Sequence, residues 1–280
     1  MNVTDATIRA LNASEIETLV AWAAAEGWNP SLTDAACFRY ADPGGFLGAF
    51  KDGAMVSGIS GVRYGKNYGF VGLYICRPDM RGKGYGKAVW NACMAMLDDR
   101  TVGLDGVVEQ QANYRSMGFE PAYRTFRWSG KPSGGVEETS DVRPAVASDF
   151  AAITAIDRRI FPSERAAFLE KWLAPPHRVR VASQDGEING YGVLRQCRDG
   201  CKIGPLVAPD LQTAKRLFWS LSGSYDDVIH LDVPEPQGAF AAFLADSGLM
   251  KGFETARMYR GEAPRLEQDE LFAVTTLELG

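Results

Sequence analysis

The stretch VGLYICRPDMRGKGYGKAVWNACMAML, residues 71–97, joins two apolar patterns through a turn rich in glycine and cationic side chains. The apolar run 70–76 is typical of a strand buried on both faces, and Pro78 ends it. After Gly86 the apolar residues recur at helical spacing, which predicts a helix that begins near Gly84. The sequence therefore predicts a strand, a glycine-rich turn and a helix in succession.

The turn has the composition of an anion-binding site. Backbone N–H groups and the helix dipole favour a negatively charged ligand at the start of a helix. Gly82, Gly84 and Gly86 tolerate positive φ and close approach of a ligand, while Arg81 and Lys83 add positive charge. We interpret the turn as a cradle for phosphate or pyrophosphate. The alternative is an ordinary strand-to-helix turn with solvated cations.

The glycine spacing differs from two common phosphate motifs. The turn reads G-x-G-x-G rather than the G-x-G-x-x-G of dinucleotide-binding folds, and Gly86-Lys87 is followed by alanine rather than the hydroxyl residue of Walker A. The turn instead resembles the R/Q-x-x-G-x-G/A signature of the GNAT superfamily of acetyl-CoA-dependent N-acyltransferases. This resemblance implies that the acetyl-CoA pyrophosphate binds Arg81, Gly82, Lys83, Gly84, Tyr85 and Gly86. It also implies that the pantetheine arm pairs with the preceding strand at Leu73, Tyr74 and Ile75.

Composition narrows the class of protein. The 280 residues are 46% hydrophobic and 23% charged, which is typical of globular proteins and long enough for two domains. A net charge of -5 argues against nucleic-acid binding, and no apolar run is long enough to span a membrane. The five cysteines fit reduced thiols in a cytoplasmic protein, and with two histidines we expect no metal site.

The chain contains an internal repeat of spaced landmarks. The offsets between partners lie between 127 and 134 residues. The pairs include Arg77-Pro78-Asp79 with Ala208-Pro209-Asp210, Leu104-Asp105 with Leu231-Asp232, and Gly118 and Arg127 with Gly248 and Arg257. A nearly constant offset over several landmarks indicates two copies of one α+β domain.

We therefore expect an α+β fold made of two GNAT-like domains in tandem, each a twisted mixed sheet flanked by helices. Residues 1–130 would form the acetyl-CoA-binding and catalytic domain, 131–140 a linker, and 141–280 a GNAT-like domain without the pyrophosphate loop. In the second copy, side chains with Cβ atoms replace the glycines, so one acetyl-CoA site is expected. Ser14 with Glu17 predicts a capping box at the start of the first helix.

The resemblance also implies a general acid. GNAT enzymes place a tyrosine four residues before a Gly-Phe pair, and Tyr114 has this spacing to Gly118-Phe119. The alternative for Tyr114 is a packing residue. A general base is harder to identify, because the neutral form of a lysine-like amine costs about 4.6 kcal/mol at pH 7 and the strand 68–73 carries no carboxylate. Water, a neighbouring loop, Glu109 or Asp105 remain possible bases.

The resemblance implies that the loop 28–38 lies where GNAT enzymes bind the acceptor. Trp28, Phe38, Tyr40 and Asp42 could line an aromatic and acidic pocket for a cationic amine, although Trp28 and Phe38 could equally be core residues. The sequence thus predicts an acetyl-CoA-dependent N-acetyltransferase, first for a small-molecule amine and second for a protein lysine or N-terminus. The alternative from another class is a non-catalytic acyl-CoA sensor. We expect a monomer or homodimer.

Overall fold

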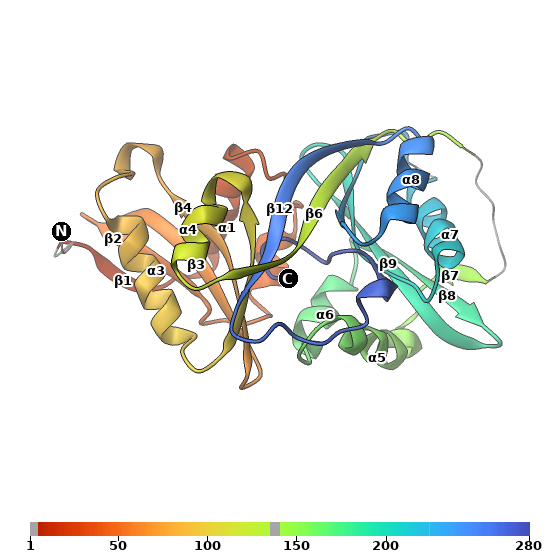
Figure 1. The fold of residues 1–280 in the computed structure, drawn as a ribbon, viewed down its shortest axis with the longest axis horizontal. Coiled ribbons are helices and arrows are strands. Elements are labelled where there is room, and N and C mark those ends of the chain that lie inside the picture. Colours follow the sequence, from red (N-terminus) through yellow and green to blue (C-terminus); the bar gives the residue numbers. More distant parts are fainter. Residues whose placement is uncertain (1–4, 135–140, 224) are drawn as a thin grey trace.

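The computed structural model describes residues 5–134, 141–223 and 225–280, which form one sheet of thirteen strands flanked by helices (Figure 1). The proposed linker 131–140 lies partly outside the described residues, at 135–140. The first half of the chain forms strands β1 (Thr7–Ala10), β2 (Phe46–Lys51), β3 (Ala54–Tyr64), β4 (Tyr68–Cys76), β5 (Thr101–Val107) and β6 (Glu120–Gly130). Its helices are α1 (Ala13–Ala25), α2 (Asp34–Phe38), η1 (Pro78–Met80), α3 (Tyr85–Met96), η2 (Val108–Gln110) and α4 (Gln111–Ser116).

The second half repeats this order of elements. Its strands are β7 (Val142–Pro144), β8 (Arg178–Gln184), β9 (Glu187–Gln196), β10 (Cys201–Val207), β11 (Ile229–Pro234), β12 (Met250–Arg260) and β13 (Leu271–Ala273). Its helices are η3 (Ala147–Asp149), α5 (Phe150–Ile160), α6 (Ala166–Trp172), α7 (Leu211–Ser222), α8 (Gly238–Asp246) and η4 (Gln268–Glu270). Strands β4 and β5 pair in parallel, and so do β10 and β11, whereas the other pairs are antiparallel. The expected mixed α/β fold is confirmed.

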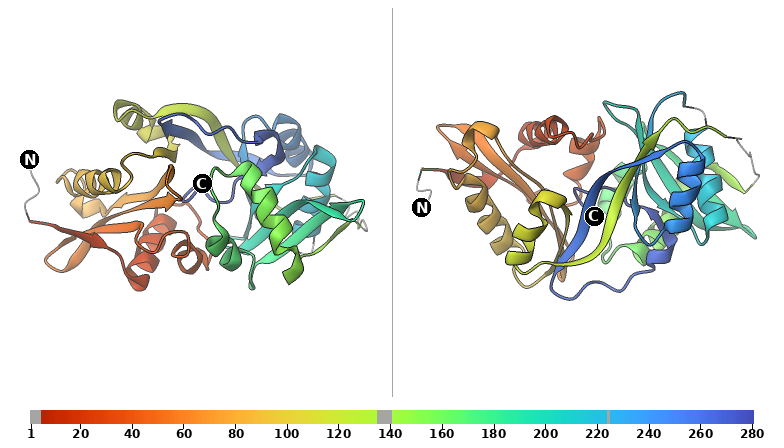
Figure 2. Two further views of the ribbon diagram at one scale, coloured as in Figure 1. Left: turned by 90° about the horizontal axis from the view of Figure 1, so that it is seen from below. Right: turned by 45° about the horizontal axis from the view of Figure 1, so that its top comes forward.

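Glycines on β3 let helices pack closely on both faces of the first half. A Cβ at Gly58 would lie 2.6 Å from a methyl group of Leu19 on α1, and one at Gly61 would lie 2.3 Å from the Cys93 sulfur on α3. Residues an odd number apart in a strand point to opposite faces. Helices α1 and α3 therefore cover opposite faces of the sheet, as Figure 2 shows.

One long strand of each half, β6 in the first and β12 in the second, completes the sheet of the other half. The strand order runs β4-β5-β12-β6-β11-β10, so β12 pairs with β5 and β6 pairs with β11. Strands β6 and β12 also pair with each other and cross between the two halves in Figure 1. The two halves therefore share one continuous sheet.

Two buried ion pairs accompany this exchange of strands. The Arg257 guanidinium donates to both carboxylate oxygens of Asp105, each at 2.9 Å. Arg127 binds Asp232 in the same way, at 2.8 and 2.9 Å. The repeat relates Arg127 to Arg257 and Asp105 to Asp232, so the exchanged strands make equivalent contacts in both halves.

The two halves differ where the central strands separate from their parallel neighbours. Strand β4 pairs with β5 only as far as Val71, and β10 pairs with β11 only as far as Ile203. In the second half β13 then pairs with β10 at Leu206 and Val207 and fills the opening. Among the described residues, no strand takes that place beside Leu73 to Ile75 in the first half.

The first helix begins two residues earlier than the proposed Ser14–Glu17 box would place it. Asn12 is the N-cap, because its side-chain oxygen accepts from the Glu15 amide at 3.0 Å. The Glu15 carboxylate accepts in return from the Asn12 amide at 2.9 Å and also binds Arg9. The Arg9 contact fixes Glu15 as the reciprocal partner, so the prediction of Ser14 and Glu17 was wrong.

Candidate active site

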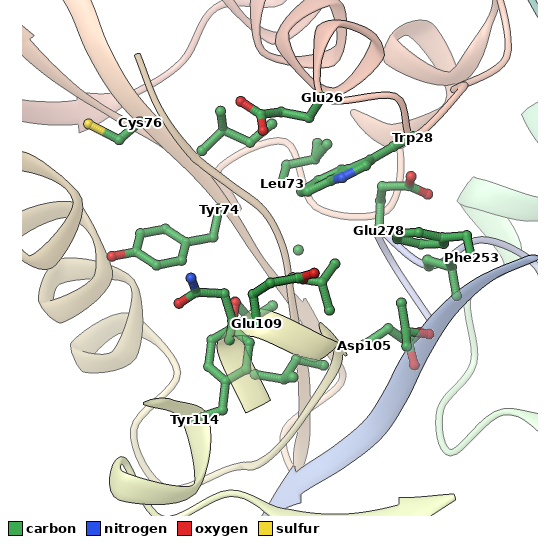
Figure 3. A pocket seen from close by; sticks show the side chains of 18 of the residues that line it. Glu26, Trp28, Leu73, Tyr74, Cys76, Asp105, Glu109, Tyr114, Phe253 and Glu278 are labelled. Carbon is green, nitrogen blue, oxygen red and sulfur yellow. The ribbon is translucent and has the colours of Figure 1, made fainter. Parts of the chain in front are cut away.

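A cavity of about 660 Å³ lies where the first half meets the exchanged strand β12. Strands β4 and β5 and the segment 107–114 line it from the first half. The second half contributes Phe253, Thr255, Leu277 and Glu278. Figure 3 shows Trp28, Phe253 and Glu278 on one side of the cavity and Tyr114 on the other.

The wall formed by β4 has an irregular backbone. Leu73 adopts φ 48°, a left-handed conformation that is rare for residues other than glycine, and the β3–β4 register shifts between Gly58 and Ser60. Leu73, Tyr74 and Ile75, to which the resemblance assigns the pantetheine arm, all line the cavity. Since β5 has separated here, the backbone on that side of β4 can pair with an extended ligand.

The glycine-rich turn begins α3 at one end of this wall. Gly82 and Gly84 have positive φ values of 75° and 91°, and Gly84 is the N-cap of α3 without any capping side chain. The first N–H groups of a helix have no partner within the helix, so this end can accept an anion. The Arg81 side chain lines the cavity and its Nε donates to the Cys76 carbonyl at 3.1 Å.

The remaining residues of the turn lie outside the lining of the cavity. Lys83 folds back, with its ammonium group 2.8 Å from the Asp79 carbonyl oxygen. Tyr85 is buried and its hydroxyl donates to Asp5 at 3.3 Å, so its side chain supports the turn from the core. A Cβ at Gly86 would lie 3.0 Å from the Tyr74 hydroxyl, so glycine allows α3 to approach β4 closely here.

Tyr114 on α4 presents its ring to the cavity. The ring stacks on Trp90 with centroids 5.5 Å apart and also contacts Phe119, and Gly118 ends α4 with φ 88°. Burial raises the pKa of Tyr114 above its ordinary value, so the hydroxyl stays protonated at neutral pH. Within the described part of the chain this hydroxyl has no hydrogen-bond partner. The group can therefore donate a proton or hydrogen bond to a ligand in the cavity.

Of the four residues expected to bind the acceptor, only Trp28 lines the cavity. Its carbonyl oxygen accepts from the Arg127 guanidinium at 2.8 Å and from the Lys202 ammonium at 3.3 Å. Strands β6 and β10 therefore hold Trp28 in place through buried cations.

The other three residues have different contacts. Phe38 is fully buried and stacks on Trp172 with centroids 6.3 Å apart, so it belongs to the core. Tyr40 is 48% exposed and lies under the Lys171 ammonium. Asp42 binds Arg63 through both oxygens, at 2.6 and 2.8 Å. The expected placement of Phe38, Tyr40 and Asp42 in the pocket was therefore wrong.

Four carboxylates lie around the cavity, and two of them are neutralised by arginine. Asp105 uses both oxygens to bind Arg257, which makes it a poor candidate base. Glu26 binds Arg81. Glu109 lies on the exposed segment η2, whereas Glu278 is buried at 5% exposure and comes from the second half. No local pattern in the sequence distinguishes Glu278, because only the folded tail brings it to the cavity.

The described residues contain neither a cluster of metal ligands nor a membrane-spanning helix. No three or more His, Cys, Asp or Glu side chains among them are grouped so that they could hold a metal ion. No helix within 5–134, 141–223 and 225–280 has both the length and the apolar character needed to cross a membrane.

Comparison with known proteins finds the same family in both halves. Residues 11–119 match the model of the acetyltransferase (GNAT) family, and residues 153–273 match a model of an acetyltransferase (GNAT) domain. The holothin acyltransferase of Pseudoalteromonas sp. (strain SANK 73390) is 32% identical over 263 residues, which cover 92% of this chain and 89% of that protein. The uncharacterized N-acetyltransferase YitH of Bacillus subtilis (strain 168) is 24% identical over the full length of both chains.

Solved structures share the fold. A Pyrococcus horikoshii structure aligns with a TM-score of 0.84 at 19% identity, over 100% of this chain and 98% of that one. A tandem GNAT protein from the clavulanic acid biosynthesis pathway aligns with a TM-score of 0.63 at 13% identity, over 92% of this chain and 100% of the other. At these identities the likeness concerns the fold alone.

Proposed function

The chain belongs to the GNAT family of acyltransferases, with two family domains in tandem, and from this premise we propose that it transfers an acetyl group from acetyl-CoA to the primary amine of a small molecule. One observation carries the proposal. The separated strand β4, Arg81 at the start of the glycine turn and the protonated Tyr114 all line the same cavity.

The residues present fit acetyl-CoA as the acyl donor. Gly84 begins α3 with positive φ and no capping side chain, which leaves the first N–H groups of the helix for a pyrophosphate. The open backbone of Leu73 to Ile75 suits the amide groups of the pantetheine arm. Bound there, acetyl-CoA supplies the thioester, and Tyr114 protonates the sulfur that leaves.

We place the single acetyl-CoA site in the first half and assign residues 1–130 to the catalytic domain, with 141–280 as a domain without the pyrophosphate loop. Two features of the second half support this division. The Asp210 side chain caps α7 by accepting from the Thr213 amide at 2.8 Å, whereas the N-cap of α3 in the first half is Gly84, which has no side chain. Strand β13 also fills the opening beside β10, where a pantetheine arm would have to lie.

The lining of the cavity supports a small amine as the acceptor. Trp28 and Phe253 offer aromatic surfaces. Glu109 and Glu278 have no ion-pair partner among the described residues, which favours an acceptor with a positively charged group. The Pseudoalteromonas relative is named for transfer to one compound, holothin, which also favours a compound over a protein as the acceptor here.

Free-thiol release tests the proposal. The protein would be incubated with acetyl-CoA and a panel of amines, namely 2-phenylethylamine, spermidine and a lysine-containing peptide. We expect thiol release with at least one of the two small amines and an N-acetylated product by mass spectrometry. Preference for the peptide would make the acceptor a protein side chain. Tight acetyl-CoA binding without thiol release with any amine would contradict the proposal and favour a sensor.

A further inference from the structure

The tail that follows β13 is held against β4 by contacts from both halves. The Tyr64 hydroxyl donates to the Leu279 carbonyl at 3.0 Å, and the Arg165 guanidinium donates to the Gly280 carbonyl at 3.0 Å. The backbone of Glu278 lies so close to β4 that a Cβ at Gly72 would be 2.1 Å from the Glu278 carbonyl oxygen. These contacts place Glu278 directly beside the irregular backbone of the cavity wall.

The side chain of Glu278 differs from the other carboxylates around the cavity. It is buried at 5% exposure and lines the cavity, while its Oε2 accepts from the Thr276 hydroxyl. Within the described residues, no arginine, lysine or histidine nitrogen lies within 4.0 Å of this carboxylate. Its negative charge acts on the buried cations Arg127 and Lys202 from a greater distance.

The remaining candidates for a base are less suitable. Both oxygens of Asp105 are occupied by Arg257, and Glu26 is paired with Arg81. Glu109 also lines the cavity, but it is an exposed residue on η2, where water has access to its carboxylate. Glu278 alone combines burial, access to the cavity and the lack of a close cation. Since Tyr114 lies across the cavity in Figure 3, an acid and a base would stand on opposite sides of a bound thioester.

We propose that Glu278 is the general base of this enzyme and that the second half of the chain thus supplies a catalytic residue to the acetyl-CoA site of the first half. The assignment rests on the proposed acetyl transfer. The carboxylate takes a proton from the bound ammonium group, and the neutral nitrogen then forms its bond to the acetyl carbon and releases its second proton to solvent. The carbon–sulfur bond breaks, and the leaving thiolate takes the proton of the Tyr114 hydroxyl. Glu278 then loses its proton to solvent, and Tyr114 regains one.

The test is the pH profile of kcat/KM in Glu278→Gln, measured with the fastest amine of the panel above. Glutamine keeps the size of the side chain and can still accept from Thr276, so the tail should stay in place. With the base present, the protonated amine can bind and lose its proton within the site, so kcat/KM depends little on pH below the pKa of the amine. In the variant without the base, only the neutral amine reacts, so kcat/KM rises tenfold per pH unit up to the pKa of the amine.

We expect Glu278→Gln to lose about 100-fold in kcat/KM at pH 7 and to bind acetyl-CoA as the wild type does. Glu278→Asp should recover part of the rate and the level profile. Glu262→Gln serves as the matched control, because its side chain is 84% exposed and lies outside the cavity lining.

Three results would overturn the assignment. The first is a Glu278→Gln variant with the wild-type rate and profile, and the second is a loss explained by weaker acetyl-CoA binding alone, which would make the residue structural. In the third, Glu109→Gln shows the steep profile instead. In each of these cases the wild type still transfers acetyl groups, so the proposed function stands. No transfer by the wild type with any amine would overturn the function and the base together.

Discussion

At the scale of single residues, the sequence predicts the parts of the site that depend on local backbone chemistry. Gly82 and Gly84 were assigned by their spacing, and their positive φ values confirm the expected backbone. Tyr114 was assigned from the resemblance to GNAT enzymes, by its spacing to Gly118-Phe119, and it lines the cavity. Phe38 and Asp42 were misplaced because burial and an ion pair depend on partners distant in sequence, Trp172 and Arg63.

Gly84→Val should abolish acetyl-CoA binding. Valine at φ 91° strains the start of α3 and places methyl groups among the N–H groups that would hold pyrophosphate. Gly53→Val is the matched control, because Gly53 has φ 79° in the β2–β3 turn and lies outside the cavity lining. Both variants should lose stability, and only Gly84→Val should lose affinity by calorimetry. Unchanged affinity in Gly84→Val would remove the pyrophosphate cradle from the model of the site.

Tyr114→Phe should keep acetyl-CoA binding and lose about 100-fold in turnover at pH 7. The leaving thiol has an ordinary pKa near 8.5, so the thiolate needs less help as the pH rises and the loss should shrink. Burial raises the pKa of Tyr114, so the wild-type hydroxyl remains protonated through pH 9 and keeps its role. Rapid-mixing measurements of thiol release between about pH 6 and 9 test this. Full activity of the variant at every pH would make Tyr114 a packing residue.

At the scale of elements, the structure contains the predicted strands and helices. The sequence did not distinguish the residue that caps the first helix, or which of β6 and β12 pairs with β5. Asn12 and Ser14 both offer a capping side chain with a glutamate three residues later, and only the contact with Arg9 distinguishes Glu15. Strands β6 and β12 carry equivalent arginines, so either could satisfy Asp105. A repeated sequence leaves this choice open, because both pairings make the same local contacts.

Glu15 should make the stability of the protein depend on acid pH. The hydrogen bond from Arg9 is the largest cause that lowers the pKa of Glu15 from 4.5 to about 2. Stability from this group is therefore complete above pH 4.5 and is lost as the pH falls toward 2. Glu15→Gln should cost about 1 kcal/mol at pH 6 and much less near pH 3, by urea unfolding. A cost independent of pH would exclude the charge as its source.

Arg257→Met should destabilise the protein by about 3–5 kcal/mol, because the Asp105 charge is left buried without its partner. The double variant Arg257→Met with Asp105→Leu should be less destabilised, since it buries no charge. Chemical unfolding of the two single variants and the double variant gives the coupling energy. Additive losses would show that the pair does not hold β12 on β5.

At the scale of the whole molecule, the two halves of the repeat are not independent structural units. The exchange of β6 and β12 gives both halves a common sheet, and a core cluster contains Phe38 and Tyr64 of the first half with Phe161 and Trp172 of the second. The number of domains was predictable from the repeat, and the fold from the resemblance of the glycine motif and the order of elements to GNAT enzymes. The composition of the cavity was not, because Phe253 and Glu278 reach it only through the exchanged strand and the tail.

The full chain should unfold in one transition rather than two. Since each half contains a strand of the other, unfolding either half removes sheet partners from both. Fluorine NMR on protein labelled with fluorotryptophan can follow Trp90 in α3 and Trp219 in α7 separately. We expect their native signals to disappear at the same urea concentration. Midpoints that differ clearly between the two signals would show that the halves are independent.

The exchange of strands also determines the order in which strands can pair while the chain is being synthesised on the ribosome. Val107 ends β5 and Met250 begins β12, which are 143 positions apart. At about 5–20 residues per second, roughly 7–29 s pass between the synthesis of β5 and that of its final partner strand. Strand β6 is synthesised before β12 and carries Arg127, the equivalent of Arg257. We therefore expect β6 to pair with β5 first and to be replaced there by β12 later. A nascent chain would then pass through a single-domain arrangement before the tandem one forms, and slow translation of the second half would prolong it.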